Sequence, residues 1–377
     1  VGGDCRSSEG GGDMEGTSMR RTAAFTTVAL CLLLTTAGPA DAQWAIESKD
    51  GKSSIKFGFL VQGRAETFDD PDGDDAAKDL YFRRLRLIAG GKITDKFTFF
   101  METDSPGLGK GNPDGTKQRS DIYIQDFVLN YKFSEGFSLD GGLILIPTCY
   151  NCNQSAASLL PVDYGAFSFL SSAVTTANVG RDYGLQARGY LVNDHLEYRA
   201  GVFQGNRGED STNDFRFAGR VMWNFFEPQK GLFYVGTSLG TKKLLSVGAS
   251  YDTQDDYSTY AFDVFFDYPL FESDGLTLQA DWIHYDGGDF LTGLPETDAM
   301  LFEAAYYFGK IKLAPFLQVV IRDPVDDAVP DQTAWQAGLA YYPMGHRLAL
   351  KLGLGQLETD GAPDRFRAIL QIQVFMF

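Results

Sequence analysis

The sequence predicts an all-β fold, a transmembrane antiparallel β-barrel of about sixteen strands. Side chains alternate between apolar and polar in many segments of about ten residues, the length that a tilted strand needs to cross a bilayer. Long and short connectors alternate between these segments, as they do in outer-membrane barrels. No apolar run downstream of residue 42 approaches the ~18–20 residues of a membrane helix.

The alternation is clearest in residues 178–204, which read NVGRDYGLQARGYLVNDHLEYRAGVFQ. Tyr183 and Leu185 lie on one side, Arg188 lies on the other, and the chain reverses at Asn193-Asp194. Period-two patterning around a two-residue turn predicts an antiparallel hairpin. Since similar patterning recurs to the C-terminus, we expect lipid on the apolar side and an aqueous lumen on the side that carries the arginines.

The composition agrees with a β-rich chain. Aromatic residues make up 14% of the 377 residues and there are 42 glycines, which favours strands and turns over helices. The net charge of −17 argues against a nucleic-acid partner.

The N-terminal region has the three parts of a secretory signal peptide. Met19-Arg20-Arg21 is a basic start, Ala23 to Leu34 form an apolar core, and Ala40-Asp41-Ala42 is a small-x-small cleavage site. Export is compatible with a periplasmic, secreted or outer-membrane protein, and the strand pattern favours the last. The predicted organisation is an upstream segment without a folded role (1–18), a signal peptide (19–42) and a barrel domain (43–377).

The connectors support an alternating topology. Connectors 67–78 and 148–180 are long, whereas Thr94-Asp95 and Asn193-Asp194 are tight turns, so we expect the long ones outside the cell and the short ones in the periplasm. Connector 226–242 breaks this rule, and an extra short hairpin is one explanation. The predicted strands span 55–66, 79–93, 96–103, 121–133, 137–147, 181–191, 195–204, 215–225, 243–252, 259–267, 276–285, 298–308, 311–321, 333–341, 348–357 and 365–377.

A soluble β-propeller or double sandwich would also contain many short strands. Neither explains the alternating connector lengths. Neither explains aromatic residues near strand ends on the side assigned to lipid, such as Tyr123, Tyr131, Trp223 and Tyr341.

Alternation assigns more basic than acidic side chains to the lumen. An Arg or Lys on the lipid side costs ~2–4 kcal/mol at the bilayer midplane, which directs these residues inward. Basic rings favour anions, so we expect a mild anion preference. The alternative is that the arginines pair with inward-facing acids and only stiffen the wall. The candidate pore-lining residues are Arg84, Arg86, Arg188, Arg199, Arg216 and Arg220.

The long connector Thr148 to Gly180 is rich in apolar residues, among them Leu159, Leu160, Phe167 and Phe169. An exposed loop would not carry so much apolar surface, so we expect this third long loop to fold into the lumen and narrow it. An outer lid or a subunit contact is the alternative.

Two residue groups could hold a bond or an ion. Cys149 and Cys152 form a C-x-x-C pair without clustered histidines, so a local disulfide is favoured over a metal or redox site. Asp70, Asp72 and Asp74 could bind Ca²⁺ or a cation that bridges lipopolysaccharide, although a solvated acidic loop is the simpler interpretation. No cofactor and no catalytic set are expected.

Three motifs resemble the phosphate-selective porin O and P family: YFRRLRL at 81–87, GRDYG at 180–184 and GVFQG at 201–205. The similarity extends over roughly residues 55–377. It implies a sixteen-stranded porin, usually trimeric, with the third long loop inside. Family members known for phosphate carry an arginine ladder and a lysine-rich throat. The six arginines could form a ladder, but residues 148–180 contain no lysine, so phosphate selectivity is not carried over.

The predicted function is passive diffusion of small hydrophilic solutes, anionic or neutral, through the outer membrane of a Gram-negative bacterium. The expected partners are membrane lipid, lipopolysaccharide and two further copies of the chain in a homotrimer. The chain is not expected to be an enzyme. The alternative is a scaffold barrel around a partner, such as a multihaem cytochrome in a porin-cytochrome electron conduit.

Overall fold

The computed structural model describes residues 44–69, 76–119 and 121–377. The chain divides into two units, residues 1–42 and 43–377, and the described residues all belong to the second. The predicted upstream segment and signal peptide lie outside the described residues, as do Asp70, Asp72 and Asp74.

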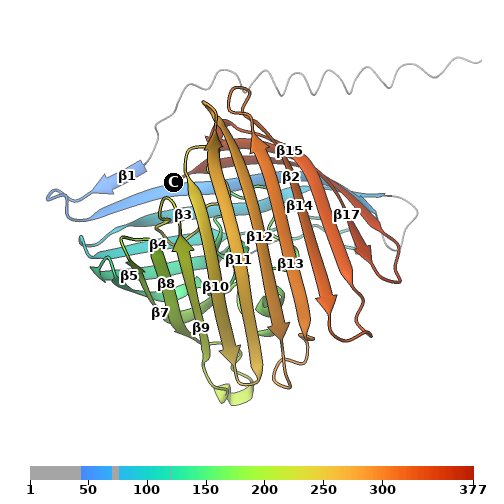
Figure 1. The fold of residues 1–377 in the computed structure, drawn as a ribbon, viewed down its shortest axis with the longest axis horizontal. Coiled ribbons are helices and arrows are strands. Elements are labelled where there is room, and N and C mark those ends of the chain that lie inside the picture. The colour runs from blue at the N-terminus through green and yellow to red at the C-terminus, as the bar shows by residue number, and fades with distance from the viewer. Residues whose placement is uncertain (1–43, 70–75, 120) are drawn as a thin grey trace, which may run out of the picture. The chain divides into compact units, whose positions relative to one another are not determined.

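Within the described residues, sixteen antiparallel strands close into a barrel (Figure 1). Each strand pairs with the next along the chain, and the ring closes where the last strand pairs with the first, with Gln371 opposite Arg64. The sixteen strands are β2 (Ser54–Asp69), β3 (Ala76–Lys92), β4 (Phe97–Asp104), β5 (Tyr123–Ser134), β6 (Phe137–Leu145), β7 (Arg181–Leu191), β8 (Leu196–Phe203), β9 (Arg216–Asn224), β10 (Leu244–Gln254), β11 (Tyr257–Leu270), β12 (Asp274–Asp286), β13 (Thr297–Tyr307), β14 (Leu313–Pro324), β15 (Gln332–Tyr341), β17 (Leu348–Thr359) and β18 (Arg365–Met376).

Two short strands lie beside this ring. β1 (Trp44–Glu47) pairs with the start of β2, on the edge that β18 covers further along. β16 (Pro343–His346) lies in the turn between β15 and β17. The edge of β2 is therefore paired over nearly its whole length, which leaves few backbone groups without partners.

All sixteen predicted strands are confirmed, and their bounds differ from the prediction by no more than three residues. The reason is the strict division of side chains between the two faces. In β11, for example, Phe262 is 57% exposed on the outer face, whereas its neighbours Ala261 and Asp263 are 0% and 5% exposed. A closed sheet between hydrocarbon and water imposes this period of two on every strand, and the pattern is readable from sequence.

The helical elements are short: η1 (Asn151–Asn153), α2 (Leu170–Val174) and η2 (Glu209–Ser211). In the described part of the chain, we find no helix with the length and apolar character that a bilayer crossing requires.

Candidate functional site

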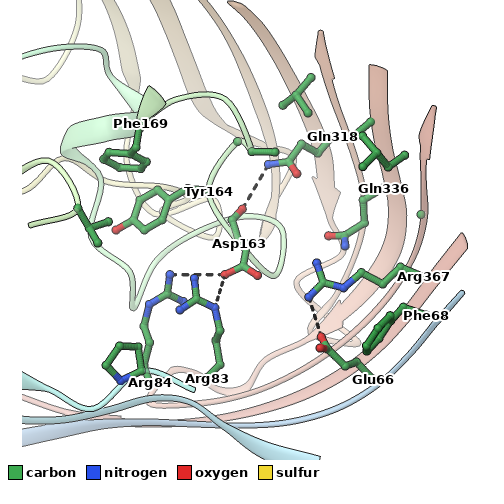
Figure 2. A pocket seen from close by; sticks show the side chains of 18 of the residues that line it. Glu66, Phe68, Arg83, Arg84, Asp163, Tyr164, Phe169, Gln318, Gln336 and Arg367 are labelled. Atoms are coloured by element: carbon green, nitrogen blue, oxygen red, sulfur yellow. Dashed lines mark hydrogen bonds and ion pairs between the residues drawn. The ribbon is translucent and has the colours of Figure 1, made fainter. Parts of the chain in front are cut away.

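A cavity of about 830 Å³, here called the basic cavity, is lined by residues of β2 to β5, β7, β14, β15, β17 and β18, by the connector after β4 and by part of loop 148–180 (Figure 2). Its charged lining residues comprise seven basic side chains and four acidic ones, although the whole chain is acidic. The basic residues are Arg83, Arg84, Arg86, Lys110, Arg181, Arg365 and Arg367, and the acidic residues are Glu66, Asp69, Asp104 and Asp163.

Asp163 is the centre of the charge network in this cavity. Its carboxylate accepts hydrogen bonds from Arg64 Nη1 at 2.7 Å and Arg83 Nε at 3.0 Å, and Arg84 Nη2 lies 3.5 Å away. Figure 2 shows Arg83 and Arg84 extending from the wall toward it. Burial alone would raise the pKa of Asp163, but Arg83, Arg64 and Arg84 outweigh burial and hold this pKa well below the usual range of a carboxyl. Asp163 is the only charged residue between Thr148 and Gly180, a signal that sequence reasoning missed.

A β-bulge in β3 supplies the second arginine of this contact. Gln62 of β2 lies opposite Arg84 and the next residue, Gly63, lies opposite Phe82, so Arg83 is the extra residue of the bulge. Strict alternation would place Arg83 on the outer face beside Leu85. The bulge turns both Arg83 and Arg84 toward Asp163, as bulges near functional sites often do.

A second bulge, in β5, changes which residues face inward at the same level. Glu102 lies opposite Asp126 and Thr103 lies opposite Ile124, so Gln125 is the extra residue. Gln125 and Asp126 are both buried, each 1% exposed. The shift also reverses Tyr123, which was expected on the lipid side but lines the basic cavity.

A smaller cavity of about 260 Å³, here called the apolar cavity, adjoins the basic one at Arg86 and Arg181, which line both. Its other lining residues come from β2, β3, β4, β18, loop 148–180 and connector 226–242. They are Leu60, Ile88, Phe100, Glu102, Ser155, Ala156, Ala157, Leu232, Phe233, Phe375 and Phe377.

The six arginines predicted to line the pore are all buried on the inner face. Arg84 and Arg86 line the basic cavity, whereas the other four line neither of the two cavities. Each of these four forms an ion pair with an acid of its own or a nearby strand. The pairs are Arg188–Asp140, Arg199–Glu197, Arg216–Asp252 and Arg220–Asp263. A role of the six arginines in selectivity stays a prediction.

The pair between Arg220 and Asp263 spans three strands. Arg220 is on β9 and Asp263 is on β11, and their charged groups meet at 2.6 Å over Gly248 of the intervening β10. A Cβ at Gly248 would lie 2.3 Å from Arg220 Nη2 and 2.6 Å from Asp263 Oδ1. The absence of a side chain at this position is therefore what allows the ion pair to form.

Loop 148–180 is bonded to inward-facing side chains from several strands of the ring. Asn151 N donates to Asp281 on β12 at 2.8 Å, and Lys351 on β17 donates to the carbonyl of Pro161 at 2.8 Å. Gln373 on β18 donates to the carbonyl of Ala157 at 2.8 Å. These bonds satisfy backbone groups of an irregular segment that would otherwise be buried without partners. Near the start of the loop, Cys149 and Cys152 are joined by a disulfide bond.

Connector 226–242 runs along this loop and does not form the extra hairpin that was one explanation of its length. Tyr234 makes an isolated parallel bridge with Gln154, and Tyr234 N donates to Asn153 O at 2.8 Å. The connector also accepts hydrogen bonds from two wall arginines, Arg188 to Gly231 O at 2.8 Å and Arg199 to Leu232 O at 3.1 Å. Its length serves contacts with the inner wall and the loop.

The described residues contain no group of three or more His, Cys, Asp or Glu side chains arranged to hold a metal ion. The two cavities offer a solute charged and polar groups in one and a mainly apolar lining in the other.

Comparison with known proteins identifies the family. A sequence model described as phosphate-selective porin O and P matches residues 55–284, more than half of the chain. The chain belongs to this family. No curated protein sequence matches it.

Solved structures share the barrel at low sequence identity. OmpF of Salmonella typhi, in a complex with daunomycin, aligns with a TM-score of 0.61 and 16% identity over 88% of this chain and 100% of that one. The anion-selective porin of Comamonas acidovorans aligns with a TM-score of 0.59 and 15% identity over 86% and 100%. The outer membrane channel DcaP of Acinetobacter baumannii aligns with a TM-score of 0.56 and 10% identity over 88% and 99%. Family and fold together make this chain an outer-membrane porin of a Gram-negative cell.

Proposed function

We propose that this porin allows passive diffusion of small hydrophilic solutes with a mild preference for anions. The observation that carries the preference is the excess of seven basic over four acidic residues around the basic cavity. Arg83 has the most accessible side chain of the arginines at Asp163, 30% exposed against 1% for Arg64 and 3% for Arg84, so it is the group that a passing anion meets first. Basic groups along a passage lower the barrier for anions.

Loop 148–180 folds into the lumen and sets the width of the passage in this proposal. Its bonds to Asp281, Gln373 and Lys351 support this, because these side chains belong to inner faces of strands on different parts of the ring. Connector 226–242 packs on the loop and fills more of the interior beside β7 and β8. Solutes then pass on the side of β2, β3 and β18.

Reconstitution of the purified protein in a planar bilayer under a KCl gradient tests the preference. We expect a reversal potential that favours Cl⁻ over K⁺. Replacing Arg83 by Gln should move this potential toward K⁺, whereas the control Lys52→Gln, at an exposed turn outside the cavity, should leave it unchanged. A wild-type channel that prefers K⁺ contradicts the proposal.

A scaffold barrel around a multihaem cytochrome is less well supported. Such a barrel must hold a folded partner. The basic and apolar cavities, at about 830 and 260 Å³, are of the size that holds small molecules.

We further infer that the channel is a homotrimer embedded in lipid and lipopolysaccharide. The wall around β4 and β8 supports this, because each of these strands has only eight residues. At ~3.3 Å per residue and with the usual tilt, such a strand falls short of the ~30 Å hydrocarbon core. Neighbouring copies would cover that wall. A monomer mass in mild detergent by analytical ultracentrifugation contradicts the trimer.

A further inference from the structure

The apolar cavity differs in chemistry from the basic cavity that it adjoins. Nine of its thirteen lining residues are apolar, and they come from the barrel wall, from loop 148–180 and from connector 226–242. Leu60 and Ile88 of the wall are 2% and 5% exposed, and Ala156 and Ala157 of the loop are both 5% exposed. A hydrated inorganic ion gains nothing from such a lining, which disfavours its passage.

Three phenylalanine rings shape this cavity. Phe100 of β4 meets Phe233 of connector 226–242 edge to face, with 5.4 Å between ring centroids. Phe100 meets Phe377 in the same way at 5.7 Å. Edge-to-face surroundings of this kind favour a further aromatic or alicyclic ring. The volume of about 260 Å³ is enough for one small ring.

The end of the cavity that meets the basic cavity is charged. Arg86 is firmly held there by Glu102 at 2.7 Å and Asp104 at 2.9 Å. Arg181 contacts Asp126 through both Nε and Nη2 at 3.3 Å, donates from Nη1 to the carbonyl of Val179 at 2.9 Å, and lies 4.0 Å from Glu102. Of the two cations at this junction, Arg181 has the longer distances to its carboxylate partners.

We propose that the apolar cavity is a subsite for the hydrocarbon body of a small amphiphilic monoanion, an aromatic or alicyclic carboxylate whose charged group lies at Arg181. The carboxylate reaches this point through the basic cavity, and its ring replaces water among Phe100, Phe233 and Phe377. The subsite rests on the proposed function, since the solute must first enter as an anion. It adds a selection that charge alone does not give: between two carboxylates, the one with a compact apolar ring is retained longer.

The test is partial block of the KCl current through single channels by two carboxylates of the same charge. Sodium benzoate carries a ring, whereas sodium acetate carries only a methyl group. We expect benzoate to halve the current at a concentration at least tenfold lower than acetate. Equal concentrations for the two salts overturn the proposal.

Two variants on the same connector separate the subsite from general effects. Phe233→Ala removes one ring of the cavity and should weaken the block by benzoate about tenfold without changing the block by acetate. Phe226→Ala removes an exposed ring that lies outside the cavity and should change neither. A loss of benzoate block in Phe226→Ala, or none in Phe233→Ala, overturns the proposal.

A third variant tests the charged end. Arg181→Gln should weaken the block by benzoate and by acetate to a similar extent, and an unchanged block overturns the place given to the carboxylate. The reversal potential in a KCl gradient, measured on the same channels without benzoate, reports the anion preference separately. A failed subsite and a failed anion channel therefore give different results.

Discussion

Replacing Asp163 by Asn should increase the anion preference of the channel. The change removes one negative charge from the cavity and keeps the shape of the side chain, while the main-chain carbonyl of Asp163 still accepts the hydrogen bond from Gln318. Arg64 and Arg84 keep their other partners, Gln371 and Gln62. The charge balance around the cavity then moves further toward the basic side.

The size of the effect follows from Coulomb's law. An ion that passes about 5 Å from the carboxylate in a water-filled lumen interacts with it by about 1 kcal/mol. Screening at about 0.1 M salt reduces this to about 0.5 kcal/mol. The change favours Cl⁻ and disfavours K⁺ by that amount, about 1 kcal/mol in total, so the ratio of Cl⁻ to K⁺ permeability should rise roughly fivefold.

The assay is the reversal potential of reconstituted channels in a KCl gradient, repeated from pH 7 to pH 4. Because neighbouring arginines hold the pKa of Asp163 below its usual range, its carboxylate stays ionised over this whole interval. The difference between wild type and Asp163→Asn should therefore stay constant. Asp95→Asn, which removes a charge from an exposed turn, is the matched control and should have no effect. An unchanged ratio in Asp163→Asn refutes the reasoning, and a difference that vanishes toward pH 4 refutes the lowered pKa.

Three further changes probe the framework around the passage. Arg220→Ala leaves Asp263 buried without its cation, so thermal unfolding should reveal a loss of about 3–5 kcal/mol, while the permeability ratio stays near the wild-type value; the opposite pattern would make Arg220 a selectivity residue. Gly236→Ala places a Cβ 2.2 Å from the carbonyl oxygen of Ser158, so connector 226–242 must move away from loop 148–180 at a cost of about 1–3 kcal/mol. Single-channel conductance should then rise while the circular dichroism spectrum stays unchanged. Unchanged conductance would mean that the connector does not narrow the passage. The double substitution Cys149→Ser and Cys152→Ser removes a disulfide of sequence separation 3 that contributes about 2 kcal/mol to stability. It should lower the unfolding temperature, measured by gel mobility after heating, without abolishing conductance.

The strands could be predicted from sequence because two solvents impose the alternation. Phe262 and Asp263 belong to opposite faces for a physical reason that leaves a trace in every strand. Bulges leave no such trace. The extra residues Arg83 and Gln125 lie within otherwise regular segments, and only the pairing with the neighbouring strand reveals that each shares a face with its successor.

The partners of the inward-facing charges were also beyond the reach of the sequence. Alternation assigns Arg220 to the inner face, but its bond to Asp263 depends on the registers of three strands and on the missing side chain of Gly248. Asp163 could have been singled out, because it is the only charge in a long apolar loop. Its three arginine partners come from strands far from it in the chain.

Arg188, Arg199 and Arg216, each ion-paired with an acid, belong to β7, β8 and β9. Arg83 and Arg84, which the bulge turns toward Asp163, belong to β3. These three ion pairs and the arginines at Asp163 thus lie on different strands of the ring, although Arg181 of β7 also lines the basic cavity. A few substitutions near β3 and β18 could change which solutes pass through the porin, while the ion pairs of β7, β8 and β9 are kept. The same arrangement would let an engineered pore be redesigned at side chains of β3 while the ion pairs of β7, β8 and β9 stay in place and the backbone pairing of β18 with β2 keeps the barrel closed.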